Sequence, residues 1–417
     1  MGQAEARAPR RAKNVKVHSS KQSAEASFLF LYSDTGGGHR AAASAIDEAL
    51  SSTSEGARIR SHHVDAFAAC GVFPLREGVA SYGAMLKVQP SPYPAIYHLT
   101  NGQTRYRVIS ELGLPFIRRN LRRMLEMTKP DVIVSVHPLI NSYARTVMSA
   151  LDSHATLVTV ITDLVTIHHS WTSGAAADEY VVPTPEARAL CIARGIAPEH
   201  VHDLGLPIRS GFHPRTADAA TAKSDLGLDP KRRTLLVMAG GEGGGKLKKL
   251  LPEIADTVRA LGVQLVVVAG RNSALRKRLL EITDRLGDAP QILGFIDNVA
   301  DYMRAADVLL SKAGPGAIAE AFACGLPIVL FEYISGQERG NLDFVAARGG
   351  GVVALSADAV ASALQRLMRP GSPELAAMRE RALAAARPHA ARDIARFLTG
   401  LLARRRQVSG VAPTSSP

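Results

Sequence analysis

Two series of short apolar segments run through this chain of 417 residues, and a helical pattern follows each segment. The first series consists of SFLFLYS at 27–33, DVIVSVHP at 131–138, TLVTVITD at 156–163 and EYVVPT at 179–184. The second consists of TLLVMAGG at 234–241, VQLVVVAG at 263–270, QILGFI at 291–296, DVLLSKAG at 307–314 and LPIVLFEY at 326–333. Strands that alternate with helices form parallel sheets covered by helices on both faces. The sequence therefore predicts an α/β protein with two doubly wound domains.

A segment without apolar periodicity, GFHPRTADAATAKSD, separates the two series. It predicts a linker at 210–228 between a first domain at 27–209 and a second domain at 229–403. Residues 1–26 and 404–417 carry charged and small polar side chains with little to bury, so we predict two disordered tails, the first of them basic. Two domains of this kind face each other across a cleft, and ligands bind where the strands end.

The net charge of +12 predicts anionic partners, namely an anionic lipid surface together with a phosphorylated donor. A solvated basic surface is the alternative. Only 5% of the residues are aromatic and no nucleic-acid recognition motif is present, which disfavours nucleic acid as the partner. The chain has no apolar run long enough to span a bilayer and no apolar core in its basic N-terminus. Its three cysteines are scattered, which suits a reducing compartment and predicts a cytoplasmic protein.

Three glycine-rich segments follow predicted strands, and each precedes a helical pattern. A glycine turn lets the backbone approach a ligand closely, and the start of the helix presents free N–H groups to an anion. The glycine-loop positions predicted to bind a diphosphate are Gly36, Gly37, Gly38, Gly241, Glu242, Gly243, Gly314, Pro315 and Gly316. The Gly-Lys-Ser/Thr ending of a Walker loop is absent from AGGEGGGK at 239–246, which disfavours ATP chemistry.

Four polar side chains beside these loops suggest a chemistry. His39 starts a predicted helix at the cleft and can accept a proton from a hydroxyl at neutral pH, although a helix-capping role is the alternative. Glu320 lies one turn into the helix after Gly-Pro-Gly and can accept hydrogen bonds from two ribose hydroxyls. Gln337 and Glu338 follow the next strand and can bind neighbouring hydroxyls of a sugar.

The segment TDLVTIHHSW at 162–171 also follows a strand of the first domain. Asp163 and His168 can orient His39 or replace it as the base, and Trp171 offers an apolar plate to a lipid or a sugar. Metal binding lacks a third ligand at a fixed spacing, so we expect no metal and no other cofactor.

Two further segments suggest a membrane. LPFIRRNLRRMLEM at 114–127 places apolar residues on one helical face and arginines, including Arg118 and Arg122, on another. This pattern suits anionic headgroups, although a helix packed on its sheet with an exposed arginine face gives the same pattern. The irregular segment at 71–102 mixes Pro, aromatic and apolar residues and is a candidate insertion for a lipid acceptor.

The motifs SDTGGGHRAAASAI, GGEGGG, KAGPGAIAEA and YISGQERGN, in this order, resemble those of monogalactosyldiacylglycerol synthases and related bacterial diacylglycerol glucosyltransferases. More distantly, the glycine loops resemble the N-acetylglucosaminyltransferase that forms lipid II. The resemblance covers about residues 28–353. It implies a GT-B fold of two Rossmann-like domains, with the acceptor lipid on the first and a UDP-sugar on the second. The implied reaction is inverting, metal-independent transfer of galactose or glucose from a UDP-hexose to diacylglycerol on the cytoplasmic face of the cell membrane.

The resemblance also implies roles for individual residues. His39 corresponds to the general base, Gly36 to Gly38 to the loop beside the diphosphate, Glu320 to the ribose ligand, and Gln337 with Glu338 to the ligands of the donor sugar. Asp163, His168 and Trp171 match a stretch near the acceptor. The family commonly has Pro at the positions of His169 and Ser335 and an aromatic residue at Thr172, which leaves the acceptor and the sugar open.

Three alternatives stay open at this point. One is transfer of N-acetylglucosamine to a polyprenyl-linked acceptor, and another is a sugar-nucleotide epimerase, which shares the two-domain architecture. The third is a non-catalytic protein that binds a UDP-sugar or a lipid. The sequence makes no prediction of the oligomeric state.

Overall fold

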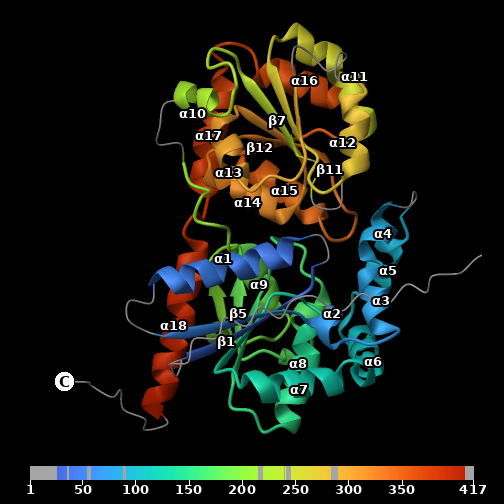
Figure 1. The fold of residues 1–417 in the computed structure, drawn as a ribbon, viewed down its shortest axis with the longest axis vertical. Helices are drawn as coiled ribbons and strands as arrows, with labels where there is room; N and C mark the ends of the chain where they lie inside the picture. The colour runs from blue at the N-terminus through green and yellow to red at the C-terminus, as the bar shows by residue number, and fades with distance from the viewer. Residues whose placement is uncertain are drawn as a thin grey trace, which may run out of the picture.

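The computed structural model describes residues 26–34, 37–53, 58–87, 91–214, 219–238, 240, 246–282 and 290–408. These residues form two α/β domains that lie one above the other along the long axis of the molecule (Figure 1). Most of the two predicted tails, residues 1–25 and 409–417, lie outside the described residues. Among the described residues, no helix combines the length and the apolar character that crossing a bilayer requires.

The first domain is built on a six-stranded sheet with the strand order β2-β1-β3-β4-β5-β6. Its strands are β1 (Ala26–Tyr32), β2 (Ile59–Asp65), β3 (Val132–Ser135), β4 (Thr156–Val160), β5 (Glu179–Val182) and β6 (Val201–Asp203). Its helices are α1 (Gly38–Thr53), α2 (Ala66–Cys70), α3 (Leu75–Ala80), α4 (Tyr82–Lys87), α5 (Tyr93–Thr100), α6 (Gln103–Gly113), α7 (Arg118–Thr128), α8 (Ile140–Ala150) and α9 (Pro185–Ala193). Short 3-10 helices are η1 (Leu114–Phe116), η2 (His169–Trp171), η3 (Ser173–Ala175) and η4 (Pro198–His200).

The second domain repeats this plan with the strand order β12-β11-β10-β7-β8-β9. Its strands are β7 (Thr234–Met238), β8 (Gln264–Val268), β9 (Gln291–Leu293), β10 (Val308–Lys312), β11 (Ile328–Glu332) and β12 (Gly351–Val353). Its helices are α10 (Ala219–Asp225), α11 (Leu247–Ala260), α12 (Ser273–Leu280), α13 (Val299–Ala305), α14 (Pro315–Ala323), α15 (Arg339–Arg348), α16 (Ala357–Leu367) and α17 (Pro373–Ala385).

All described strand pairs in both sheets are parallel. A parallel sheet covered on both faces needs strands that are apolar on both faces, and β1 meets this requirement. Phe28 and Phe30 pack on the face covered by α1, while Leu29 and Leu31 pack on the opposite face against α2, α7 and α8. The predicted doubly wound α/β architecture is therefore confirmed.

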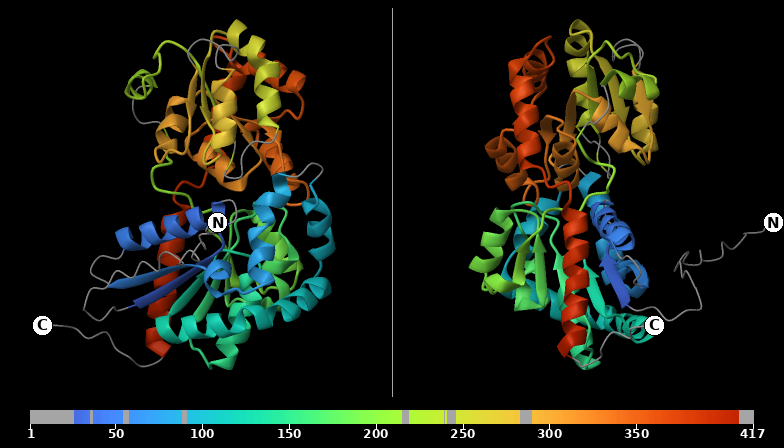
Figure 2. Two further views of the ribbon diagram at one scale, coloured as in Figure 1. Left: turned by 45° about the vertical axis from the view of Figure 1, so that its right-hand side comes forward. Right: turned by 90° about the vertical axis from the view of Figure 1, so that its left-hand side faces the viewer.

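The C-terminal helix α18 (Ala390–Val408) belongs to the first domain by its packing, although the sequence boundary of 229–403 assigns most of it to the second. It leaves the second domain after α17 and runs along the first, where it packs against α1 (Figure 2). Ile394, Ala395 and Leu398 are fully buried in the same cluster as Phe28 and Phe30. The chain therefore crosses between the domains twice.

The predicted linker at 210–228 is also shorter in the structure. Phe212 is buried in the core of the second domain together with Leu206 and Ile208. Helix α10 packs against α13, so residues 219–225 belong to the second domain. This segment is rich in Ala and polar residues, so its sequence did not indicate the short helix α10.

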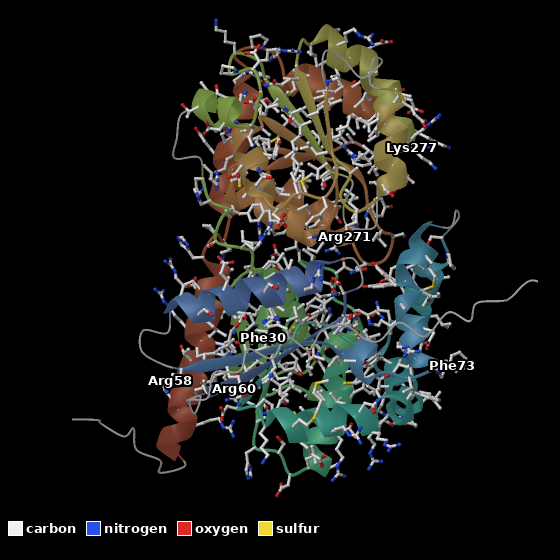
Figure 3. All side chains as sticks on the ribbon, viewed as in Figure 1. Phe30, Arg58, Arg60, Phe73, Arg271 and Lys277 are labelled. Atoms are coloured by element: carbon white, nitrogen blue, oxygen red, sulfur yellow. The ribbon has the colours of Figure 1, made fainter. Side chains whose placement is uncertain are left out.

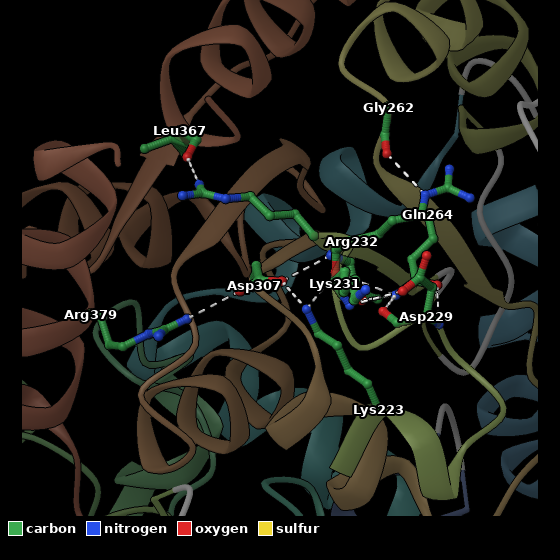
Figure 4. Close-up of polar contacts among 11 residues, drawn as sticks. Lys223, Asp229, Lys231, Arg232, Gly262, Gln264, Asp307, Leu367 and Arg379 are labelled. Atoms are coloured by element: carbon green, nitrogen blue, oxygen red, sulfur yellow. Dashed lines mark hydrogen bonds and ion pairs between the residues drawn. The ribbon is translucent and has the colours of Figure 1, made fainter. Parts of the chain in front are cut away.

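A buried ion pair fixes α10 and the base of β10 to the second domain. Lys223, whose side chain is almost fully buried, places Nζ 2.8 Å from Oδ2 of Asp307. Oδ2 also accepts a hydrogen bond from the backbone N–H of Thr234 at 2.9 Å, and Arg379 lies 3.8 Å from Oδ1. Figure 4 shows these contacts converging on Asp307, directly before β10. The Gly-Pro-Gly turn predicted to bind the donor follows the other end of β10. The network at Asp307 therefore holds in place the strand that positions this turn.

Candidate active site

A cavity of about 870 Å³ lies between the two domains, where strands of both sheets end. Residues that follow β1, β3, β4, β10 and β11 line it, as the topology of doubly wound sheets requires. Helices α3, α4, α5 and α6 of the first domain supply a mostly apolar wall. The cavity therefore joins a polar end at the strand termini to an apolar end beneath four short helices.

The loop after β1 lies directly at this cavity. Gly37 has a positive φ of 79°. Apart from chain neighbours and the backbone of α1 itself, no heavy atom of the described residues lies within 4 Å of the position that a Cβ would take at Gly37 or Gly38. Both glycines line the cavity at the N-terminus of α1. This is the open backbone that the sequence predicts for an anion site, while Gly36 lies outside the described residues.

His39 lies in the first turn of α1 and lines the cavity. Its ring meets the ring of His137, which follows β3, edge to face at a centroid distance of 4.8 Å. Burial lowers the pKa of His39 to about 4, although the backbone carbonyl of Ser33 favours the charged ring. Burial and the neighbouring His39 also hold the pKa of His137 well below its usual range. Two imidazoles that are neutral at physiological pH therefore lie side by side, and a neutral imidazole can accept a proton.

Asp163 follows β4 and lines the cavity between the two domains. Its Oδ2 accepts a hydrogen bond from Nε1 of Trp171 at 2.7 Å, and its Oδ1 accepts one from Nε2 of Gln337 at 3.4 Å. Burial raises the pKa of Asp163 to about 6, against the lowering effect of these two donors. Asp163 is thus held by one side chain from each domain.

Trp171 differs from the prediction of an open apolar plate. Its side chain is only 1% exposed, it packs in the core of the first domain, and it is not among the described residues that line the cavity. The indole ring therefore reaches the site through its N–H group, which orients the carboxylate of Asp163.

His168 also lines the cavity, but both of its ring nitrogens have partners within the protein. Nδ1 lies 2.7 Å from the hydroxyl of Ser170, and Nε2 lies 3.2 Å from the hydroxyl of Thr100. Burial lowers the pKa of His168 to about 4. His168 thus connects helix α5 to the loop after β4.

The second domain contributes the N-terminus of α14. Gly314, Pro315 and Gly316 line the cavity, and within the described part of the chain no side chain caps the first turn of this helix. The free backbone N–H groups of that turn and the helix dipole therefore face the cavity, which is the arrangement of an anion site. Glu320, further along α14, lines the same cavity, and burial raises its pKa to about 7, partly offset by Arg209.

Gln337 and Glu338 follow β11, and both line the cavity. Glu338 is 3% exposed, and its two oxygens bind Nζ of Lys312 at 2.9 Å and the backbone N–H of Ile334 at 2.8 Å. The carboxylate thereby holds Lys312 beside the N-terminus of α14. Lys312 lies against Gly240, whose positive φ of 75° brings the end of β7 close to it.

Other predicted residues lie away from the cavity or outside the described part of the chain. Arg118 and Arg122 are exposed on α7, neither is among the described residues that line the cavity, and Arg122 pairs with Glu126 at 2.9 Å. The positions Gly241, Glu242 and Gly243 are not described. Among the residues that are described, no group of three or more His, Cys, Asp or Glu side chains is arranged to hold a metal ion.

Several cavity residues were not predicted from the sequence. His137 and Lys312 both end a strand segment that the sequence identifies, so their position after β3 and at the end of β10 was a usable signal. Tyr82 and Tyr93 come from α4 and α5 in the irregular segment, where no periodicity distinguishes a site residue from a structural one. Arg209 lies in the crossover between the domains.

Comparison with solved structures establishes the fold. MurG of Acinetobacter baumannii matches with a TM-score of 0.57 and 14% identity, over 90% of this chain and 99% of that chain. The UDP-GlcNAc 2-epimerase from Neisseria meningitidis, solved with UDP-GlcNAc, matches with a TM-score of 0.55 and 13% identity, over 90% and 100%. The predicted GT-B architecture is confirmed, and it is shared by transferases and epimerases.

Sequence comparison identifies the family. Residues 39–208 match the model of monogalactosyldiacylglycerol synthase, and residues 234–395 match that of the glycosyltransferase family 28 C-terminal domain. A probable monogalactosyldiacylglycerol synthase 3 of Oryza sativa subsp. japonica is 34% identical over 88% of this chain and 73% of its own length. Monogalactosyldiacylglycerol synthase 3 of Arabidopsis thaliana is 32% identical over 88% and 79%. The resemblance seen in the motifs is therefore confirmed, and the chain belongs to the monogalactosyldiacylglycerol synthase family of glycosyltransferases.

Proposed function

We propose that this protein transfers galactose or glucose from a UDP-hexose to the free hydroxyl of diacylglycerol, with inversion at the anomeric carbon. The observation that carries the proposal is one cavity lined by a neutral histidine, an uncapped helix N-terminus and an apolar wall. These features suit a proton acceptor, a diphosphate site and a lipid site. The names of the relatives support the reaction and favour galactose.

In this proposal His39 removes the proton of the diacylglycerol hydroxyl as its oxygen attacks the anomeric carbon. Its low pKa keeps the ring neutral at physiological pH, so that it can accept the proton without first losing one. The negative diphosphate of the bound donor favours the imidazolium that forms. His168 is less suited to this role because hydroxyl groups occupy both of its ring nitrogens.

The departing UDP gains negative charge. We propose that this charge is stabilised by the first turn of α14, by the glycine loop before α1 and by Lys312. Preorganised N–H groups stabilise such charge without reorganisation. Oε1 of Glu338 lies 2.9 Å from Nζ of Lys312, and this ion pair fixes the position of the ammonium group. Part of the proposal is that no metal ion takes part in this step.

The acceptor occupies the apolar end of the cavity in this proposal. Ile96, Ile109 and Leu112 line the cavity and are also exposed at the surface of α5 and α6. Phe73, Leu99 and Leu112 are highly exposed large apolar side chains of this part of the first domain, with exposed fractions of 74%, 69% and 69%. Figure 3 shows Phe73 at the outer edge of the first domain, pointing away from the sheet. Apolar side chains of α5 and α6 therefore lie both in the cavity and at the surface, which suits the entry of a lipid acceptor.

The same region supports attachment to an anionic membrane. Residues 71–128 contain eight Lys or Arg residues and three Glu residues, and Arg118 and Arg122 are exposed on α7, the helix that follows α6 and η1. Exposed apolar side chains beside a basic excess favour an anionic lipid surface. The cytoplasmic face of the cell membrane, predicted from the sequence, is part of this proposal.

Replacing Phe73 and Leu112 together by aspartate should lower binding to anionic vesicles at least tenfold, because each large apolar side chain contributes about 1.5–3 kcal/mol when buried in lipid. Cosedimentation with vesicles measures the bound fraction. Leu355→Asp, at a side chain of the second domain that is 44% exposed, is the matched control and should bind like the wild type. If Leu355→Asp lowered vesicle binding as much as the double variant does, the assignment of Phe73 and Leu112 to the membrane-binding surface would be wrong.

Glu320 predicts a pH dependence of donor binding. We propose that its carboxylate accepts hydrogen bonds from the ribose, and its pKa of about 7 means that the ionised form is lost as the pH falls below 7. UDP-hexose affinity should therefore be greatest above about pH 7 and fall by up to tenfold per unit below it. Calorimetry measures this affinity. UDP-hexose is used as the ligand instead of UDP, because the terminal phosphate of UDP titrates near pH 6 and would add a pH dependence of its own. Glu320→Gln should bind UDP-hexose more weakly than the wild type above pH 7 and about as weakly as the wild type at acidic pH, so that its affinity no longer depends on Glu320 ionisation. A variant that kept the wild-type slope would exclude this role.

The proposal is tested by the release of UDP from UDP-galactose, UDP-glucose and UDP-N-acetylglucosamine, each with diacylglycerol or a polyprenyl-linked acceptor in anionic vesicles. We expect release with a hexose donor and diacylglycerol, unchanged by EDTA. Release only with UDP-N-acetylglucosamine and the polyprenyl-linked acceptor would replace the proposed acceptor. Epimerised donor without UDP release would identify an epimerase, and donor binding without any turnover would identify a binding protein.

A further inference from the structure

Gln337, a proposed ligand of the donor sugar, is held by three side chains of the other domain. Its Oε1 accepts hydrogen bonds from the hydroxyl of Tyr93 at 3.0 Å and from that of Tyr82 at 3.3 Å. Its Nε2 donates to Oδ1 of Asp163 at 3.4 Å. The two tyrosine rings meet edge to face at a centroid distance of 5.0 Å, so they reach Gln337 as a packed pair. The second-domain amide is therefore positioned by first-domain groups.

These contacts fix which way the amide of Gln337 faces. A carboxylate can only accept hydrogen bonds, so the atom beside Asp163 must be the nitrogen. The oxygen then faces the two phenol groups, and their hydroxyl protons fill its two lone pairs. Gln337 is left with one N–H proton that is not used by these partners. In the cavity it can thus act as a hydrogen-bond donor to a sugar hydroxyl, with its direction set by the tyrosines.

The loop that carries Gln337 packs closely on the first domain, and at two of its glycines a side chain would clash with that domain. A Cβ at Gly336 would lie 2.6 Å from the ring of Tyr97, and a Cβ at Gly340 would lie 2.4 Å from Oγ1 of Thr166. The backbone N–H of Gly340 donates to that hydroxyl at 3.1 Å. Both ends of the segment 336–340 are therefore seated on the first domain, which makes the tyrosine contacts part of a defined interface.

We propose that Tyr93 and Tyr82 are positioning residues for the hexose: they orient the amide of Gln337 and thereby set how the donor sugar is recognised. The inference rests on the proposed use of a UDP-hexose and extends it to residues of the acceptor domain. Tyr93 begins α5, the helix that also presents Ile96 to the cavity and Leu99 to the surface. The sugar site is thus connected to the helices assigned to the lipid, and its geometry depends on their position.

The experiment measures the affinities of UDP, UDP-galactose and UDP-glucose by calorimetry for the wild type, Tyr93→Phe, Tyr82→Phe and the double variant, with no acceptor lipid. UDP lacks the hexose, so its affinity should change less than twofold in every variant. The double variant should lose roughly threefold to tenfold in affinity for the better hexose donor, the range that one or two hydrogen bonds account for. The ratio of affinities for the two hexose donors should move toward one.

Tyr180→Phe is the matched control. Tyr180 is buried in the first domain and accepts a hydrogen bond from the backbone N–H of Ala177 at 3.2 Å, and it is not among the described residues that line the cavity. Its variant should keep the wild-type ratio between UDP-hexose and UDP affinity. If the double variant also keeps that ratio, or if it weakens UDP as much as UDP-hexose, the positioning role is excluded.

A second comparison separates positioning from a general loosening of the domains. If the tyrosines act through Gln337, adding Tyr93→Phe to Gln337→Ala should cause no further loss of UDP-hexose affinity. A full additive loss would show that Tyr93 acts on the donor by another route and would overturn the proposal. Because no acceptor is present, a protein that proved inactive on diacylglycerol but bound UDP-hexose would still give a clear result.

Discussion

Replacing His39 by alanine should lower the rate constant for hexose transfer by about 10²- to 10⁴-fold, the range that one general base contributes. The affinity for UDP should change by less than about threefold, because the proposed diphosphate ligands are backbone N–H groups and Lys312. The reason for the large effect on rate is that His39 and His137 are the two neutral imidazoles in contact beside the first glycine loop. Steady-state turnover with diacylglycerol vesicles and calorimetry with UDP measure the two quantities.

The control for this prediction is His200→Ala, at an exposed histidine that pairs with Glu179 at 3.5 Å and is not among the described residues that line the cavity. It should keep wild-type turnover. The assignment of the base would fail if His39→Ala retained turnover within tenfold of the wild type. If Asp163→Asn or His168→Ala then abolished turnover, that residue would take the place of His39.

Replacing Asp307 by alanine should lower the free energy of unfolding of the second domain by about 3 kcal/mol. Removing the carboxylate leaves the buried ammonium group of Lys223 without its charge partner, and an uncompensated buried charge costs about 3–5 kcal/mol. It also leaves the backbone N–H of Thr234 without its acceptor. Urea unfolding followed by circular dichroism measures the change, and UDP affinity should fall in proportion to the unfolded fraction.

Asp256→Ala is the matched control for the stability measurement. Asp256 forms an ion pair with Arg259 at 2.8 Å, but its side chain is 96% exposed, and exposed pairs contribute only about 0–1 kcal/mol. Similar losses in both variants would contradict the special role of the buried pair. A stable Asp307→Ala protein would show that the contacts in Figure 4 do not hold α10 and β10 in place.

The strands that the sequence predicts are those with apolar side chains on both faces. The segments 27–33 and 234–241 have this pattern, and the strands β1 and β7 that overlap them are interior strands of their sheets. Strand β2, with the sequence IRSHHVD, was not predicted because most of its side chains are polar, which its place at the edge of the sheet permits. An edge strand has one neighbour and tolerates polar side chains, so its sequence resembles a loop.

Features that depend on tertiary contacts could not be predicted from the local sequence pattern. The apolar face of α18 is visible in the sequence, but the pattern does not tell which of the two domains will bury it. The same holds for Trp171, which was expected to be open and is buried with its N–H on Asp163. His39, Glu320 and Gln337 could be placed at the cleft from the sequence because they follow strand ends in glycine-rich motifs, and all three line the cavity. Tyr93 was missed because its role depends on contact between residues 244 positions apart.

In the proposed reaction the hydroxyl of diacylglycerol attacks the anomeric carbon of the donor directly, in a single displacement. Proton NMR of the lipid product formed from UDP-galactose and diacylglycerol tests it, since the coupling of the anomeric proton reports the configuration of the new bond. Single displacement on the α-linked donor predicts one product, a β-linked hexosyl diacylglycerol, with one UDP released per lipid. An α-linked product, or UDP release without any glycolipid, would exclude this single displacement onto diacylglycerol.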